Sequence, residues 1–300
     1  MEMKTITVFT PTYNRAYILG QLYESLTRQT SKDFCWLIVD DGSTDNTKEL
    51  IETWTAEGLL DIRYYYQENG GKMRAHNYGV TLCDTELFLC CDSDDYLVDN
   101  AVELIINKWK SYKGDKEIIS GLICPSCVYK NGIKIRNVVP QGEQLLSYRE
   151  FSTEKGNNSE AFLIYRTDIL KQYPYPVIDG EKFFPEGFTH SKISDKYKMI
   201  VITDELVICQ YMPDGYSMND IKHFVENPKS MIIVENEAAY RNGFRKSGII
   251  AASNYIIASM IGKKSLSEIF FNSRTKILTM LLFPISLIRW KNIIRKYNKT

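Results

Sequence analysis

Four apolar segments, each followed by a polar loop and an amphipathic stretch, constrain the fold of this chain most strongly. They cover residues 5–9, 34–39, 62–66 and 87–91, and the first is rich in β-branched residues. Strands that are apolar throughout and alternate with helices indicate a parallel sheet covered on both faces. We therefore predict an α/β fold with a mixed, mostly parallel sheet flanked by helices.

Helices are predicted between these strands from apolar spacing and from polar residues at their starts. Ile18, Leu22 and Leu26 share one face of the first helix, and Asn14 is its expected cap. For the second helix, one of the residues at 43–45 is the expected cap.

Three carboxylates follow the fourth strand directly: Asp92, Asp94 and Asp95. Carboxylates this close raise one another's pKa unless a positive charge lies between them. A divalent cation with oxygen ligands, such as Mg²⁺ or Mn²⁺, is the usual solution, and it commonly holds substrate phosphates too. The alternative is an acidic turn in which Asp95 caps a helix predicted at 98–109.

The position of the other polar loops favours a ligand site over an acidic turn. Loops at 10–15, 40–45, 69–77 and 92–95 all follow predicted strands. Open α/β sheets bind ligands at the carboxyl ends of their strands, so these loops are expected to share one edge.

Composition excludes some classes of partner. Lys plus Arg and Asp plus Glu both number 37, so no global field favours nucleic acid. The seven cysteines are an odd number and several lie in apolar runs, which fits a reducing cytoplasm. The chain opens without the pattern of a signal peptide, so we expect a cytoplasmic protein.

The residue types at the predicted edge match the parts of a nucleotide-sugar. Asp41 offers acceptor oxygens to a base or ribose. Asp92 and Asp94 are expected to hold Mn²⁺ or Mg²⁺ against the diphosphate, where the metal stabilises the leaving nucleotide. Lys72 and Arg74 add positive charge, although a solvated helix start is the alternative for both.

Three motifs resemble the signatures of family 2 glycosyltransferases: TPTYNR at 10–15, VDDGSTD at 39–45 and CDSDD at 91–95. The resemblance is strong over residues 4–112 and weaker to about 220. It implies the A-type glycosyltransferase fold, a Rossmann-like nucleotide-binding domain. We expect nucleotide binding by residues that match these motifs or lie beside them: Thr10, Pro11, Tyr13, Asp41, Lys72 and Asp92. The DxD element matches Asp92 and Asp94 as metal ligands, with Asp95 as an alternative ligand.

The third loop departs from the family. Where family members often carry Ala-Arg-Asn, residues 75–77 read AHN. Lys72, Arg74 or His76 is expected to replace the arginine, and a plain surface helix position is the alternative for His76.

Inverting members of the family need a base for the acceptor hydroxyl, usually within a Glu-Asp pair. No such pair follows residue 95. The nearest match is Glu186, which follows the apolar residues 183–185. An apolar pocket would raise its pKa to a useful range. Glu181 and Asp195 are rivals, and a helix cap is the structural alternative.

The resemblance implies a catalytic domain at 1–225, with a nucleotide-sugar-binding half at 1–115 and an acceptor-binding half at 116–225. A helical extension is predicted at 226–300. Within it, the apolar run at 277–288 is too short to span a bilayer and precedes a basic cluster. Segment 275–300 therefore suits peripheral contact with the inner face of the cell membrane, or a helix docked on the protein's own core.

The predicted function is metal-dependent, inverting transfer of a sugar from a nucleotide-sugar, with a UDP-sugar favoured by the family's habits. The acceptor would be a glycan or a lipid-linked molecule in surface polysaccharide synthesis. The alternative is a non-catalytic nucleotide-sugar-binding subunit. A nucleotidyltransferase is disfavoured because residues 10–13 are not a glycine-rich, basic loop.

Overall fold

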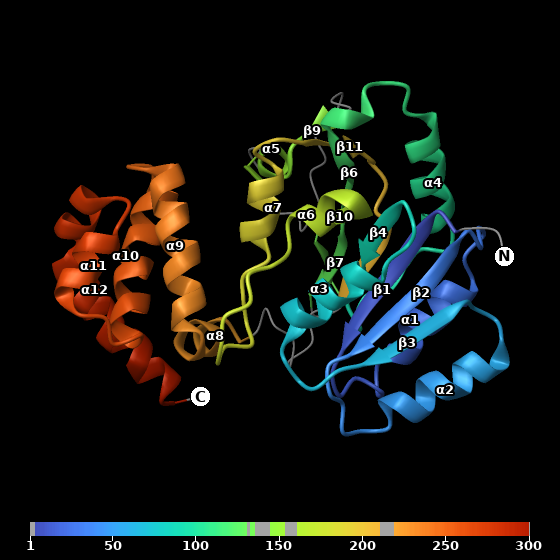
Figure 1. Cartoon of the computed structure of the whole chain (residues 1–300), viewed down its shortest axis with the longest axis horizontal. Coiled ribbons are helices and arrows are strands. Elements are labelled where there is room, and N and C mark those ends of the chain that lie inside the picture. The colour runs from blue at the N-terminus through green and yellow to red at the C-terminus, as the bar shows by residue number, and fades with distance from the viewer. Residues whose placement is uncertain (1–3, 131–132, 136–144, 154–160, 211–218, 300) are drawn as a thin grey trace. The chain divides into compact units, whose positions relative to one another are not determined.

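The computed structural model describes residues 4–130, 133–135, 145–153, 161–210 and 219–299 (Figure 1). The chain divides into two compact units. One comprises residues 1–175 and 189–212, and the other comprises 176–188 and 213–300. The predicted halves at 1–115 and 116–225 stay a prediction, while the structure groups segment 176–188 with the C-terminal helices.

An eight-stranded sheet forms the centre of the first unit, in the order β3-β2-β1-β4-β10-β6-β11-β9. The first four strands in this order pair in parallel, whereas β10 runs antiparallel to both of its neighbours. The predicted mixed, mostly parallel α/β sheet is confirmed. Its strands are β1 (Ile6–Thr12), β2 (Phe34–Asp40), β3 (Ile62–Tyr66), β4 (Leu87–Cys90), β6 (Ile119–Pro125), β9 (Leu145–Leu146), β10 (Ala161–Arg166) and β11 (Lys198–Val201).

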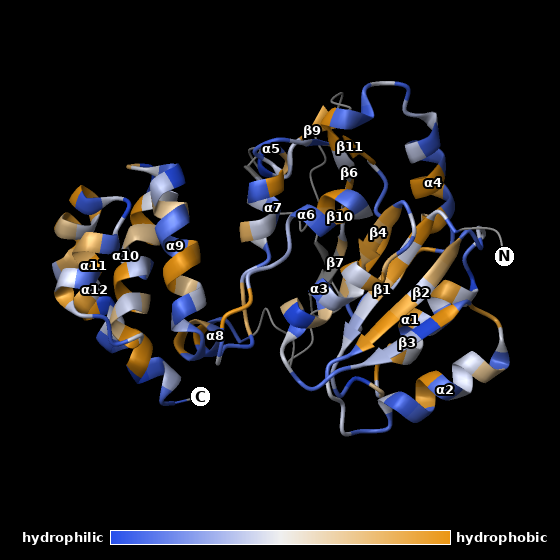
Figure 2. Cartoon of the chain, in the orientation of Figure 1, coloured by the Kyte–Doolittle hydropathy of each residue, from blue (hydrophilic) through white to orange (hydrophobic). Residues whose placement is uncertain are grey.

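Helices cover both faces of this sheet because each face carries its own apolar core. One core joins the sheet to α1 (Leu19–Thr27), α2 (Thr47–Glu57) and α4 (Ala101–Ser111). The other joins it to α3 (Lys72–Leu82), α5 (Tyr148–Thr153), α6 (Thr167–Gln172) and α7 (Gly187–Ile193). Figure 2 shows the apolar character of the central strands between these layers.

A second, four-stranded sheet lies beside the acidic run, in the order β5-β12-β7-β8. The two-residue strand β5 (Tyr96–Leu97) follows the acidic run and pairs antiparallel with β12 (Val207–Gln210). The remaining strands are β7 (Cys127–Lys130) and β8 (Ile133–Ile135), and a short 3-10 helix, η1 (Lys116–Ile118), precedes β6.

The predicted cap of the first helix, Asn14, is wrong, and so is the alternative role of Asp95 as a helix cap. Asn14 takes a left-handed conformation (φ 54°), and its side chain accepts a hydrogen bond from the backbone of Thr44. Asp95 caps no helix, because β5 follows it and α4 begins only at Ala101. For α2 the cap position is Asn46, one residue beyond the predicted range of 43–45.

The second unit contains five helices within residues 219–299. Buried alanines, Tyr255 and Ile256 form small apolar clusters between them. The helices are α8 (Asp220–Glu226), α9 (Pro228–Asn242), α10 (Lys246–Ile261), α11 (Leu266–Asn272) and α12 (Lys276–Tyr297). By length and composition alone, α12 is the described helix that is long and apolar enough to cross a membrane. The expectation of a segment too short to span is therefore corrected, because the apolar run extends into a helix of 22 residues.

We expect the packing of α3 on β1 to tolerate no added methyl group at Gly79. A Cβ there would lie 2.2 Å from the ring of Phe9, which is itself buried and stacked on Phe88. Gly79→Ala should therefore lower the free energy of unfolding by about 1–3 kcal/mol in denaturant titrations.

The matched control is Gly20→Ala in α1, where an added Cβ meets nothing within 4 Å. This variant should leave stability unchanged or raise it by up to about 1 kcal/mol, since alanine favours helix. Equal effects of the two substitutions would contradict the packing described here.

Candidate functional site

The carboxyl ends of β1 to β4 lie at one edge of the sheet, as the sequence predicted. In the parallel pairing of β1 with β2, Thr12 lies beside Asp40, and in that of β2 with β3, Asp40 lies beside Tyr66. In the pairing of β1 with β4, Phe9 lies beside Cys90. The four polar loops that follow these strands therefore form one rim, which we call the strand-end rim (residues 12–15, 40–45, 67–72 and 91–95).

Asp41 is the organising residue of this rim. Its side chain is buried, and its carboxylate accepts four hydrogen bonds from the loop after β3. The donors are the side chains of Gln67 and Asn69 and the backbone amides of Gly70 and Gly71, at 2.6–3.2 Å. Sequence reasoning missed Gln67 and Asn69, although their place directly after an apolar strand was a usable signal.

The first two loops of the rim are also joined by hydrogen bonds. The amide of Asn14 donates to Ser43 Oγ at 2.9 Å, and Ala16 donates to Asp45 at 3.1 Å. Gly42 has a φ of 86°, and a Cβ on it would lie 2.7 Å from the backbone nitrogen of Asn69. Only glycine fits this turn, because both its conformation and the close approach exclude a side chain.

The residues expected to line the nucleoside pocket differ in exposure. Thr10 is fully buried, and its hydroxyl accepts a hydrogen bond from the indole of Trp36 at 3.0 Å. Pro11 is buried near the end of β1. Tyr13 is 47% exposed, so its ring is available to a ligand at the rim.

The acidic run has the electrostatics that the sequence predicted. Burial raises the pKa of Asp94, and the neighbouring Asp92 carboxylate raises it further. For Asp95, burial comes first again, and the charges of both Asp92 and Asp94 then raise its pKa well above the usual range. A hydrogen bond with Cys209 of β12 opposes this shift. Ionisation of these carboxylates is therefore unfavourable in the folded protein.

Lys72 supplies a positive charge to this run from the first turn of α3. Its Nζ lies 2.6 Å from Asp92 Oδ2, and only 14% of the side chain is exposed. The N-terminus of α3 follows Gly71, whose φ of 96° turns the chain into the helix. A lysine at a helix N-terminus favours binding of a phosphate group. Lys72 is thus a partly buried ion-pair partner, and the alternative of a solvated helix start is wrong for it.

The other two candidates in the third loop have different surroundings. Arg74 donates to the carbonyl of Gly70 at 2.7 Å. His76 is buried, and its ring packs edge-on against Phe88 and Tyr175. The alternative of a surface position for His76 is therefore wrong, since the residue belongs to an aromatic core.

The candidates for the general base lie on different units. In the second unit, Glu181 accepts hydrogen bonds from the amides of Lys229 and Ser230, which start α9. Its role there is structural. Asp195, in the first unit, pairs with Arg149 at 3.1 Å.

Glu186 is exposed, directly before α7. The predicted apolar pocket around it is wrong. Phe184 is buried and packs against Phe188, and Phe183 stacks on His223.

The donor set of the rim fits a divalent cation held jointly with a diphosphate. Among the residues that the structure describes, no three His, Cys, Asp or Glu side chains converge on one point. Mg²⁺-type sites commonly use one or two carboxylates and take their remaining ligands from substrate phosphates and water. Asp92 and Asp94 supply two such carboxylates, and burial and the Asp92 charge raise the pKa of Asp94.

Comparison with known proteins gives the class of this fold and site. The model of the family described as "Glycosyl transferase family 2" matches residues 7–173. The chain belongs to this family and is a glycosyltransferase. It is 26% identical to glycosyltransferase GlyG of Streptococcus pneumoniae serotype 4 over 213 residues, which are 68% of this chain and 69% of GlyG. Of other curated relatives the chain spans a smaller part, between 14% and 52%.

Solved structures share the A-type glycosyltransferase fold. Staphylococcus aureus TarS 1–349 in complex with UDP-GlcNAc superposes with a TM-score of 0.60 at 18% identity, over 98% of this chain and 92% of that one. Mannosyltransferase PcManGT of Pyrobaculum calidifontis, in complex with GDP-Man and Mn²⁺, gives 0.53 at 16% identity, over 98% and 83%. At these identities the likeness shows the fold.

We expect Asp94→Asn to stabilise the metal-free protein, because burial and the neighbouring Asp92 charge both disfavour the ionised carboxylate of Asp94. A thermal melt at neutral pH should show a rise in Tm of about 1–2 °C. The raised pKa means that ionisation of Asp94 opposes folding, so this cost is present at neutral pH and disappears as the pH falls below about 4.

The control is Asp99→Asn, which removes an exposed carboxylate 3.0 Å from Arg28. Its Tm should stay the same or fall slightly, since exposed ion pairs contribute little. A lower Tm for Asp94→Asn at neutral pH would contradict the repulsion.

Proposed function

We propose that this glycosyltransferase transfers a sugar from a UDP-sugar to a glycan or lipid-linked acceptor, with inversion and with a divalent metal. The single observation that carries the proposal is the rim, where Lys72 and the start of α3 face the crowded carboxylates Asp92 and Asp94. A negatively charged diphosphate complements Lys72 and the start of α3, and a cation complements Asp92 and Asp94. The proposal places the protein in the cytoplasm, in surface polysaccharide synthesis.

Donor binding would use each part of the rim for one part of the nucleotide-sugar. Tyr13, exposed beyond β1, is proposed to contact the nucleoside. Asp41 is proposed to contact the base while its carboxylate keeps the third loop in place. Lys72 is proposed to move from Asp92 to a diphosphate oxygen, since a lysine makes charge-assisted hydrogen bonds to phosphate.

Asp92 and Asp94 would hold Mn²⁺ or Mg²⁺, with Asp95 as the alternative ligand. The bound metal would stabilise the negative charge of the leaving nucleoside diphosphate. The structure of PcManGT, which contains Mn²⁺ and GDP-Man, supports this choice of cofactor by analogy of fold.

Acceptor activation would fall to Glu186. As base, its carboxylate would remove the proton of the acceptor hydroxyl while that oxygen attacks the anomeric carbon. Glu181 accepts hydrogen bonds at the start of α9 and Asp195 pairs with Arg149, so Glu186 is the preferred candidate. The alternative of a non-catalytic binding subunit finds no support among the comparisons.

The test of the base is Glu186→Gln, which keeps the shape of the side chain and removes its basicity. We expect the transfer rate to fall by about 10²–10⁴-fold, while calorimetry shows unchanged affinity for UDP. Transfer should be measured as Mn²⁺-dependent release of nucleotide from a panel of nucleotide-sugars in the presence of acceptors.

Asp195→Asn is the matched control, and its transfer rate should equal that of the wild type. An unchanged rate in Glu186→Gln would remove this residue from the mechanism. Tight UDP binding by the wild type without turnover on any donor would favour the non-catalytic alternative.

A further inference from the structure

We infer that α12 is a docking surface for an anionic lipid bilayer and lies flat on it. All residues of this surface belong to the second unit, and none takes part in the proposed transfer reaction. The contacts of α12 distinguish a helix that lies on a membrane from one that spans it.

One face of α12 is an exposed apolar stripe. Ile277, Leu281, Ile285 and Ile288 are spaced by three or four residues and therefore share one side of the helix. Each is 54–67% exposed, and Met280 beside them is 67% exposed. At the start of the stripe, Phe271 of α11 is 79% exposed. A continuous apolar surface of this kind on a helix marks an interaction site.

The opposite face of α12 is packed on the protein. Leu278, Thr279 and Ser286 are buried, and Ser286 shares a hydrogen bond of 2.8 Å with Ser253 of α10. The side chain of Arg289 donates a hydrogen bond to Asn254 Oδ1 of α10 at 2.9 Å. Because one side is held by α10, lipid cannot surround α12, although its length and composition suit a membrane span. The geometry leaves one apolar face for insertion to the depth of the headgroups.

The positive charge of the C-terminal segment indicates which kind of surface the apolar stripe of α12 contacts. No Asp or Glu occurs after Glu268, whereas residues 269–300 contain seven Lys and Arg. Among the described residues, Lys291, Arg295, Lys296 and Lys299 form no ion pair with Asp or Glu, whereas Arg274 of the same unit does. An anionic lipid surface complements this charge, while a second copy of the chain would bring the same positive charges with it.

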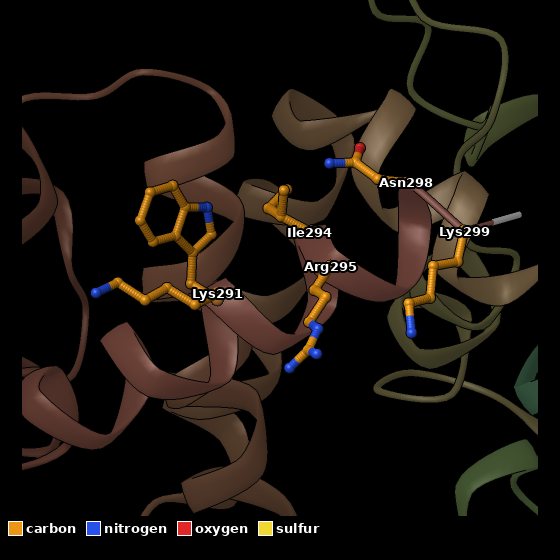
Figure 3. Close-up of a pocket in the computed structure, with 6 residues that line it drawn as sticks. Lys291, Ile294, Arg295, Asn298 and Lys299 are labelled. Carbon is orange, nitrogen blue, oxygen red and sulfur yellow. The ribbon is translucent and has the colours of Figure 1, made fainter.

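The basic end of α12 also contains a pocket of about 440 Å³ (Figure 3). Its lining places Lys291, Arg295 and Lys299 at intervals of four residues around Trp290 and Ile294. The indole N–H of Trp290 is buried and has no hydrogen-bond partner among the described residues. Cations and an indole beside apolar side chains suit the phosphate and glycerol region of a lipid. In Figure 2 the ribbon becomes hydrophilic toward the C-terminus.

The test is co-sedimentation of the full chain with phosphatidylcholine vesicles that contain or lack phosphatidylglycerol. We expect binding to the anionic vesicles only. It should be lost when salt is raised from about 0.15 M to about 1 M, which shortens the screening length from about 8 Å to about 3 Å.

Two variants probe the two parts of the surface. Leu281→Asp, in the stripe, should reduce vesicle binding by about tenfold or more, whereas Leu59→Asp, at an apolar position 59% exposed in the first unit, should not. The double substitution Lys291→Glu and Arg295→Glu should have a similar effect. Its control reverses two charges in the last turn of α4, Lys108→Glu and Lys110→Glu, and should bind as the wild type does.

Several results would overturn the inference. Equal binding to neutral and anionic vesicles would remove the role of charge. A bound fraction that resists high salt and needs detergent for release would indicate a spanning helix instead. Finally, a vesicle-free dimer that Leu281→Asp dissociates, detected by light scattering, would assign the stripe to a second copy of this chain.

Discussion

The parallel pairing of β3, β2, β1 and β4 is the constraint on which the candidate site depends. Parallel strands end at one edge, so every polar loop that follows them is brought to the same rim. The loops are then joined one to the next. Asn14 contacts the second loop, Asp41 holds the third, and Lys72 reaches from the third to Asp92 in the fourth. Each loop is therefore positioned by its neighbour as well as by its own strand.

This arrangement leaves an excess of negative charge at the rim, which a metal ion bound together with a donor nucleotide would neutralise. Asp92, Asp94 and Asp95 crowd together between β4 and β5, and the pKa values of Asp94 and Asp95 are raised by burial and mutual repulsion. Lys72 compensates Asp92 in part. A cation with a diphosphate would complete the compensation, which links the stability of the rim to the proposed reaction of a family 2 glycosyltransferase.

Much of this could be predicted from the sequence, because apolar strands and polar strand ends are local patterns. The parallel sheet, the common rim and the crowded carboxylates are confirmed. Features set by distant contacts could not be predicted. The two-residue β5 forms through pairing with β12, a distant contact that rules out the alternative role of Asp95 as a helix cap. The aromatic packing that buries His76 includes Tyr175, about 100 residues away, and Phe183 stacks on His223, which is also distant in the sequence.

Calorimetric titration of UDP in Mn²⁺ and in EDTA tests the central claim most directly, because it asks whether the carboxylates and a cation bind the diphosphate together. Wild-type protein is expected to bind UDP at least about tenfold more tightly with Mn²⁺. This difference is expected to disappear in Asp94→Asn and to persist in Asp99→Asn. Equal UDP affinity in Mn²⁺ and EDTA, with both variants behaving as the wild type, would contradict the central claim.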